Sequence, residues 1–131
     1  MGDINIWAVL AAAVSAFVLG GLWYSPRVFG KVWMREAGMT EEKAVQGHPA
    51  KVFGGAFVLS LLAAGAFALF IGQIAWQEAT LYGFMAGLFW VASSFGINYL
   101  FAQRSLKLWL IDGGYHTVQF TLYGLIIGLW K

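Results

Sequence analysis

The stretch INIWAVLAAAVSAFVLGGLWY, residues 4–24, decides the fold, because it contains no charged residue. About 20 apolar residues are enough for a helix to cross the hydrocarbon core of a bilayer. A secretory signal would have a basic start and a shorter apolar core, whereas the only charge before this stretch is Asp3. We therefore expect a retained transmembrane helix. It should end at WYSPR, residues 23–27, where interfacial aromatic residues meet a proline and a charge.

The composition of the whole chain extends this expectation. Hydrophobic residues make up 60% of the 131 residues and charged residues 11%, whereas an average soluble domain is about half apolar and about a quarter charged. We expect an all-α integral membrane four-helix bundle that forms one transmembrane domain over residues 1–131. The spans are expected at about 4–25, 50–74, 80–102 and 106–130, with a cytoplasmic loop at about 26–49. Four spans leave little chain for a separate catalytic module, and the absence of Cys excludes thiolate chemistry.

The loop between the first two spans is predicted to contain a short interfacial helix, from Arg27 to Gly38. Arg27, Lys31 and Arg35 recur every four residues, and apolar side chains occupy the opposite face. Such a segment is expected to lie along the membrane surface.

The distribution of Lys and Arg predicts the orientation of the chain. The connections between spans one and two and between spans three and four contain seven basic residues, and the opposite side has only Lys131. The positive-inside rule then places both connections in the cytoplasm and both termini outside, as expected for a multi-pass protein of a bacterial inner membrane. The formal charge of +2 is explained by these loops, so we expect no nucleic-acid partner. The seven basic residues are Arg27, Lys31, Arg35, Lys43, Lys51, Arg104 and Lys107.

Small residues and Trp are placed as a helical membrane protein requires. Small residues at four-residue spacing let helices approach closely, and they recur in the first, third and fourth spans. Six of the seven Trp residues fall near proposed interfaces, and only Trp90 lies in the middle of a span. The small residues are Ala12, Ala16, Gly20, Gly83, Gly87, Gly124 and Gly128.

A faint internal repeat suggests a duplicated helical hairpin. Residues 21–24 and 29–30 match residues 87–90 and 95–96 at the same offset, and Gly54-Gly55 can be set against Gly113-Gly114. A chain rich in Gly and aromatic residues could also produce this match by chance, so both interpretations stay open.

The candidate functional residues lie in the hairpin of spans three and four. Asp112, His116 and Gln119 recur at helical spacing and share one face of the fourth span. If the turn centres near residue 105, antiparallel pairing sets Asn98 level with Asp112. The same pairing sets Ser94 level with His116. These five residues would form a buried polar cluster or pathway.

Three interpretations of Asp112 are open, because an unpartnered charge within a membrane costs about 2.5–3.5 kcal/mol. Asp112 could cap a helix that begins at Gly113. It could instead form a proton or solute pathway with His116, or an ion pair with Arg104 or Lys107. His116 has no second His nearby and no nucleophile completes a hydrolytic set, so we expect no metal site, no cofactor and no enzyme.

Several motifs resemble those of a family of small bacterial membrane proteins catalogued as domain of unknown function 1761. The likeness covers nearly the whole chain. It implies a multi-span membrane protein and no established activity, and it supplies no catalytic residues. The motifs in this sequence are Trp23-Tyr24-Ser25-Pro26, Phe29-Gly30, Trp33, Asn98-Tyr99-Leu100-Phe101 and Asp112-Gly113-Gly114-Tyr115-His116.

Two functions fit these observations. The first is a small channel or transporter for an ion, a proton or a small solute, assembled as a homo-oligomer in the lipid bilayer. The alternative is a membrane scaffold or accessory subunit that transports nothing and whose polar residues only lock the hairpin.

Overall fold

The computed structural model describes residues 4–40, 42–43 and 47–130, and all regular secondary structure in these ranges is helical. Asp3 and Lys131, which the charge analysis used, lie outside the described residues, as does part of the predicted loop at 26–49. The elements are α1 (Ile6–Trp23), α2 (Gly30–Ala37), α4 (Pro49–Ile71), α5 (Trp76–Met85), the π-helix η1 (Ala86–Ala92), α6 (Ser93–Phe101) and α7 (Leu106–Leu129).

Three helical segments are long and apolar enough to cross a membrane: α1, α4 and the continuous α5–η1–α6 rod. Asn5 begins α1 by accepting hydrogen bonds from the backbone N–H groups of Trp7 and Ala8 at 3.0 and 3.2 Å. Gly72 ends α4 with φ at 62°, a conformation that glycine adopts without strain. The rod begins at Trp76, four residues before the predicted start of the third span.

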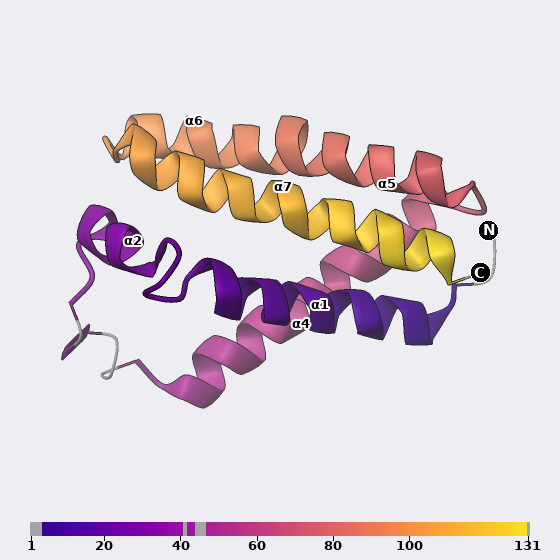
Figure 1. The fold of residues 1–131 in the computed structure, drawn as a ribbon, viewed down its shortest axis with the longest axis horizontal. Helices are drawn as coiled ribbons and strands as arrows, with labels where there is room; N and C mark the ends of the chain where they lie inside the picture. Colours follow the sequence, from indigo (N-terminus) through magenta and orange to yellow (C-terminus); the bar gives the residue numbers. More distant parts are fainter. Residues whose placement is uncertain (1–3, 41, 44–46, 131) are drawn as a thin grey trace.

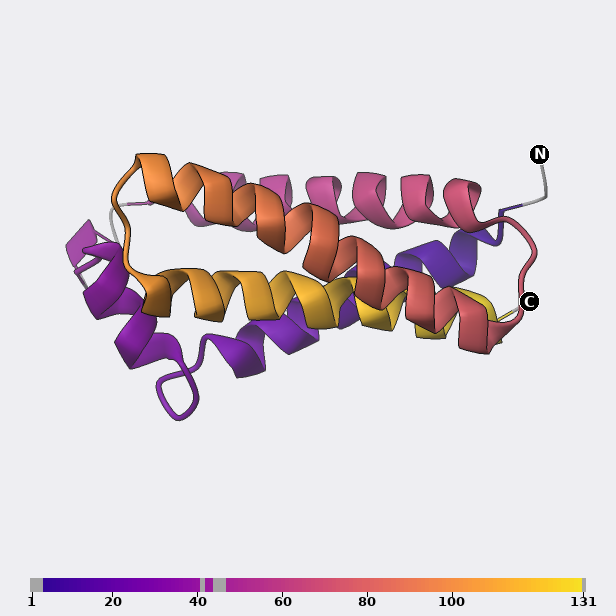
Figure 2. The same cartoon turned by 90° about the horizontal axis from the view of Figure 1, so that it is seen from above.

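The fourth long helix, α7, is more polar and lies in the middle of the molecule. It contacts each of the other helices, including η1. Figures 1 and 2 show α5–η1–α6 and α1 running alongside α7, while α4 crosses it steeply. The apolar segments thus surround the helix that carries Asp112, His116 and Gln119.

Four glycines hold α5–η1 and α7 at backbone contact. A Cβ atom added at Gly83 would lie 2.1 Å from the carbonyl oxygen of Phe120, and one at Gly87 would lie 2.7 Å from that of His116. An added Cβ at Gly124 would lie 2.0 Å from the carbonyl oxygen of Ala79, and one at Gly128 would meet the backbone at Trp76. Any side chain at these positions would push the helices apart. The predicted contacts at these glycines are therefore confirmed.

The small residues of the first span are also buried. Ala8, Ala12 and Ala16 are completely inaccessible, and α1 packs against both α7 and α4. A Cβ atom added at Gly20 would lie 3.6 Å from the Tyr115 hydroxyl oxygen. This row of small side chains lets α1 lie close to its neighbours, as predicted.

The interfacial helix is shorter than predicted. Pro26 and Arg27 lie in a tight turn in which the N–H groups of Val28 and Gly30 both donate to the Ser25 carbonyl oxygen, so α2 begins only at Gly30. Lys31 and Arg35 are exposed on α2, but Arg27 precedes it. Gly38 ends α2 with φ at 70°, as predicted.

The two ends of the molecule are each closed by polar contacts. At one end the Asn5 amide donates to the Trp130 carbonyl oxygen at 3.0 Å, so the start of α1 meets the end of α7. At the other end Arg104 donates to the Glu36 carbonyl oxygen at 3.5 Å. The Ser105 hydroxyl, which begins α7, also holds the pKa of the Glu36 carboxyl below its usual range, with Arg35 acting in the same direction. The loop helix is therefore docked on the α6–α7 turn.

Residues matched in the internal repeat have different surroundings. Gly87 contacts α7, whereas an added Cβ at Gly21 would meet nothing within 4 Å. Gly113 lies against Ala92 and Trp109, whereas Gly54 contacts nothing. The duplication therefore stays a prediction.

Replacing Gly83 by Ala should lower the free energy of unfolding by about 1–3 kcal/mol, because the new methyl group overlaps the α7 backbone. Thermal unfolding of the purified protein in detergent measures this change. Gly54→Ala is the matched control, since an added Cβ there meets nothing. Equal melting temperatures for the two variants would contradict the close α5–α7 contact.

Candidate functional site

A buried carboxylate held by two tyrosines forms the centre of the site. Asp112 is 7% exposed. Tyr24, directly after α1, donates to its Oδ1 at 2.6 Å, and Tyr99 of α6 donates to its Oδ2 at 2.5 Å. Both carboxylate oxygens therefore have a hydroxyl donor, and the two donors come from different helices.

Asp112 does not begin a helix. α7 runs without a break from Leu106 to Leu129, and Ser105 is its N-terminal cap, with its hydroxyl accepting from Leu108 N–H at 3.1 Å. The interpretation of Asp112 as a cap for Gly113 is therefore wrong. The carboxylate lies nearly two turns inside the helix, where the backbone N–H groups already bond to the preceding turn.

The interpretation of Asp112 as half of an ion pair also fails. Within the described ranges the ion pair is between Arg35 and Glu36 on α2, and neither Arg104 nor Lys107 reaches the Asp112 carboxylate. Among the described residues, the hydrogen-bond partners of the Asp112 carboxylate are therefore the hydroxyls of Tyr24 and Tyr99.

Two tryptophans fix the backbone around the acid. The indole N–H of Trp23 donates to the Ile111 carbonyl oxygen at 2.9 Å, and that of Trp109 donates to the Ala92 carbonyl oxygen at 2.8 Å. Added Cβ atoms at Gly114 and Gly113 would lie 3.0 Å from Trp23 and 3.4 Å from Trp109, so both glycines make room for the indole rings. Trp23 was expected at an interface only, yet its N–H group joins α1 to α7.

The motif residues around these tryptophans converge on the same place. Tyr115 donates to the Ala16 carbonyl oxygen at 2.9 Å and packs on the Tyr24 ring at 5.5 Å between centroids. Trp33 of α2 contacts the other side of Tyr24 at 5.7 Å. Because both neighbours are aromatic, the Tyr24 hydroxyl is held in place toward Asp112.

A second polar chain continues along α7. His116 Nδ1 lies 2.5 Å from Gln119 Oε1, and the Gln119 amide donates to the Tyr123 hydroxyl at 2.6 Å. The Tyr123 hydroxyl in turn lies 2.6 Å from the Ser60 hydroxyl of α4. With Gln119 oriented in this way, Nδ1 of His116 carries the proton. Gln119, Tyr123 and Ser60 are all buried.

Ser94 and Asn98 do not belong to either cluster. Both are exposed on α6. The predicted pairing fails because the glycine contacts set Gly87, rather than Ser94, level with His116. Tyr99 reaches Asp112 because side chains lean toward the N-terminus of their own helix, so residues on antiparallel helices can meet across several residues of offset.

Sequence reasoning missed three residues of these clusters as site residues. Tyr99 directly follows Asn98 in one of the motifs, and its side chain is the longer of the two polar side chains that could have been paired with Asp112. Tyr123 is four residues after Gln119 and so shares its helical face. Ser60 had a weaker signal, a single hydroxyl within the apolar second span.

The site offers few ligands for a metal ion. In the described part of the chain, no three His, Cys, Asp or Glu residues gather closely enough to hold one. The Phe95 ring packs against His116 at 4.7 Å between centroids. An arrangement of one acid, one imidazole and several hydroxyls is better suited to binding a proton.

A cleft of about 280 Å³ reaches the site from the α6–α7 turn. Tyr99, whose hydroxyl bonds to Asp112, forms part of its wall. Arg104, Ser105 and Trp109 form other parts. The acid is therefore one side chain away from an open surface.

The comparison with known families agrees with the motifs. A family model described as "Protein of unknown function (DUF1761)" matches residues 7–128. No curated protein and no solved structure shows a significant match to the chain.

Replacing Tyr24 by Phe should destabilise the protein by about 1–3 kcal/mol, because one oxygen of a buried carboxylate loses its donor. Thermal unfolding in detergent measures the loss. The control is Tyr82→Phe, since the Tyr82 side chain is 45% exposed. If both variants melted at the same temperature as the parent protein, the Tyr24–Asp112 bond would contribute nothing.

Proposed function

The chain belongs to the DUF1761 family, and from this premise we propose that it is an integral membrane protein that moves protons, or a small solute coupled to them, across the bilayer. The second candidate is a membrane scaffold that transports nothing. Both are argued from the described residues.

The membrane location is supported by the exposed surface. Three helical segments have the length and apolar composition of spans, and their exposed side chains include Val18, Leu62 and Phe70. We propose α7 as a fourth span of a four-helix bundle. Its length of 24 residues corresponds to about 36 Å, and its polar side chains are covered by the apolar segments.

The proposed orientation places α2 and the α6–α7 turn in the cytoplasm of a bacterial cell, and both termini outside. Basic side chains on α2 and the turn lie at one end of the molecule, where Arg104 reaches Glu36. The contact between Asn5 and Trp130 brings the start of α1 and the end of α7 to the other end. Four membrane-spanning helices would place both termini on the same side of the membrane, as this orientation requires.

The observation that carries the transport proposal is a buried carboxyl group inside a helix bundle, because the described hydrogen-bond partners of Asp112 are two hydroxyls. A hydroxyl can donate to a carboxylate and can turn to accept from a protonated acid. The Tyr24 and Tyr99 hydroxyls could therefore hold Asp112 in both forms, and we propose that Asp112 carries the transported proton.

The cleft at the α6–α7 turn supports a proton pathway, because a proton can pass along hydroxyl groups such as that of Tyr99, which lines the cleft and bonds to Asp112. His116, one turn after Asp112, is a second group that can bind a proton. We propose no chemical conversion and no cofactor at this site.

Self-association is proposed from the N-terminal two turns of α4. Residues 47–56 are exposed throughout, so this end of the helix is little covered by the other described helices. A second copy of the chain could cover this surface in the bilayer. Crosslinking in membranes would then give a dimer or a larger assembly, and a monomer at all protein densities would contradict it.

A proton flux measurement tests the main proposal. Liposomes that contain the purified protein and a pH-sensitive dye inside should acidify after an external pH drop faster than empty liposomes. Asp112→Asn should abolish the added flux, since an amide cannot take up the proton. The control Glu78→Gln changes an exposed acid in the first turn of α5 and should leave the flux unchanged.

An equal flux for the parent protein, Asp112→Asn and empty liposomes would overturn the proton proposal. Melting temperatures of the same samples separate loss of transport from loss of fold. A panel of small solutes, each with and without a pH gradient, extends the test to coupled transport.

The scaffold alternative is favoured by one observation. Throughout the described ranges, every buried side-chain nitrogen and oxygen atom has a hydrogen-bond partner. A fully satisfied polar chain locks helices together without any transport. This alternative expects no flux, a lower melting temperature for Gln119→Leu, and a partner protein that co-purifies with the parent chain but not with the destabilised variant.

A further inference from the structure

The first helix ends well before the end of the molecule that carries the α6–α7 turn. The Trp23 indole N–H donates to the Ile111 carbonyl oxygen, and the same ring lies 3.0 Å from a Cβ atom added at Gly114. Ile111 and Gly114 come five and eight residues after Leu106, the first residue of α7, or roughly 8–12 Å along its axis. The turn that follows α1 therefore lies beside the bundle and not beyond its end.

This turn projects sideways from the molecule. A Cβ atom added at Gly30 would collide with the Tyr24 carbonyl oxygen, so α2 begins against the end of α1. Figure 2 shows the connection between α1 and α2 as a loop that points away from α7. α2 then leads to the α6–α7 turn, where the Glu36 carbonyl oxygen accepts from Arg104. Residues 26–29 are all exposed.

The length of α1 sets the depth of this turn in a bilayer. α1 has 18 residues, or about 27 Å at helical rise, which is close to the thickness of about 30 Å of a hydrocarbon core. If α1 crosses the membrane, the turn lies at the boundary between acyl chains and headgroups. A side chain that projects sideways from the turn then meets lipid.

The turn and the first residue after Gly30 present two kinds of side chain to that lipid. Val28 and Phe29 are 49% and 37% exposed, and Arg27 and Lys31 are exposed beside them. Within the described ranges the ion pair is between Arg35 and Glu36, so no described carboxylate neutralises Arg27 or Lys31. Apolar side chains next to two uncompensated positive charges suit an amphipathic, negatively charged partner.

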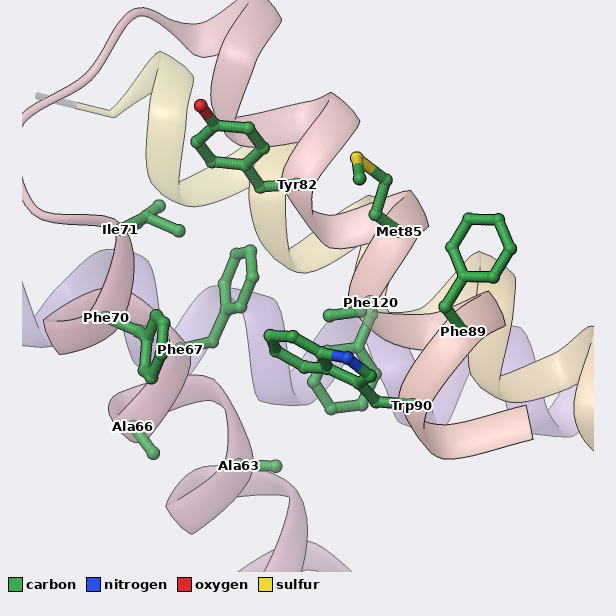
Figure 3. A pocket seen from close by; sticks show the side chains of 11 residues that line it. Ala63, Ala66, Phe67, Phe70, Ile71, Tyr82, Met85, Phe89, Trp90 and Phe120 are labelled. Atoms are coloured by element: carbon green, nitrogen blue, oxygen red, sulfur yellow. The ribbon is translucent and has the colours of Figure 1, made fainter. Parts of the chain in front are cut away.

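A second surface that lipid can reach has no such charge. A cavity of about 520 Å³ opens between α4 and the α5–η1 segment, and every residue that lines it is uncharged. Figure 3 shows its aromatic walls, in which the Trp90 ring meets the Phe70 ring edge to face. This cavity contains nothing that would distinguish one headgroup from another, whereas the α1–α2 turn does.

We propose that the α1–α2 turn binds an anionic phospholipid, with its phosphate on Arg27 and Lys31 and its acyl chains against Val28 and Phe29. A guanidinium can donate two parallel hydrogen bonds to phosphate oxygens, and an ammonium adds a second positive charge. Anionic lipids of the cytoplasmic leaflet attract basic side chains at this depth. The inference rests on the membrane location and orientation under the proposed function, and not on proton movement.

A lipid titration tests the inference. Dioleoylphosphatidylglycerol, which is anionic, or dioleoylphosphatidylcholine, which is zwitterionic, is added to the purified full chain in dodecyl maltoside, and the melting temperature is recorded. The anionic lipid should raise it along a saturable curve and at lower concentration than the zwitterionic lipid. The double variant Arg27→Gln/Lys31→Gln should weaken the apparent Kd for the anionic lipid about 25-fold, roughly fivefold for each charge.

Two controls locate the effect at the turn. The double variant Lys43→Gln/Lys51→Gln removes the same charge from other exposed positions and should keep the affinity of the parent protein within about twofold. Glycerol phosphate carries the same anionic group without acyl chains and should not raise the melting temperature at the same concentrations. Melting temperatures without added lipid show that each variant is folded.

Three results would overturn the inference: equal curves for the two lipids, equal losses for the two double variants, or an equal shift with glycerol phosphate. The first two would leave only a general response to lipid or to total charge, and the third would leave an anion site that needs no lipid. A parent protein that stays in solution without detergent would overturn the membrane location as well. Proton flux without lipid selectivity would overturn this inference alone.

Discussion

The backbone contact between α5–η1 and α7 is the constraint on which the other helices depend. Gly83 and Gly87 lie against the α7 backbone at Phe120 and His116, and Gly124 and Gly128 lie against the α5 backbone at Ala79 and Trp76, so each helix approaches the backbone of the other. In hydrocarbon, helices gain nothing by hiding apolar surface from each other, and close packing of small residues becomes the main attraction. This contact fixes how α7 is rotated, and therefore which of its faces points to α1 and α4.

The rotation of α7 decides where its polar residues lie. With its glycine face on α5, the face that carries Asp112 points to the end of α1, and Gln119 and Tyr123 point to Ser60 of α4. Asp112 and the chain from His116 to Tyr123 thus have separate partners. The first is held by two tyrosines, and the second ends in a hydroxyl pair that links α4 to α7. One helix can therefore hold a buried acid at one level and fasten α4 at another.

Much of this arrangement was predictable from the sequence, because apolar length and small-residue spacing are local signals. The helices, the glycine contacts, the row of Ala12 and Ala16, the end of α2 at Gly38 and the family follow from them. The predicted pairing of Asn98 with Asp112 was wrong, because it assumed a particular centre for the turn and a regular α-helix before it. The π-helix at Ala86–Ala92 has more residues per turn, so positions after it are rotated relative to an α-helix. Tyr99, rather than Asn98, then faces the acid, and no local pattern in this sequence announces that rotation.

The bond between the Asn5 amide and the Trp130 carbonyl oxygen gives the molecule a nearly closed topology. The first and last helices are neighbours, so the path of the chain through the helices forms a ring with one gap. The order of the helices along the chain is then separable from their contacts in space, because a short linker across that gap would allow the chain to be opened in another connection between helices. The order in which the helices are synthesised would change, while the packed structure that they form would be the same.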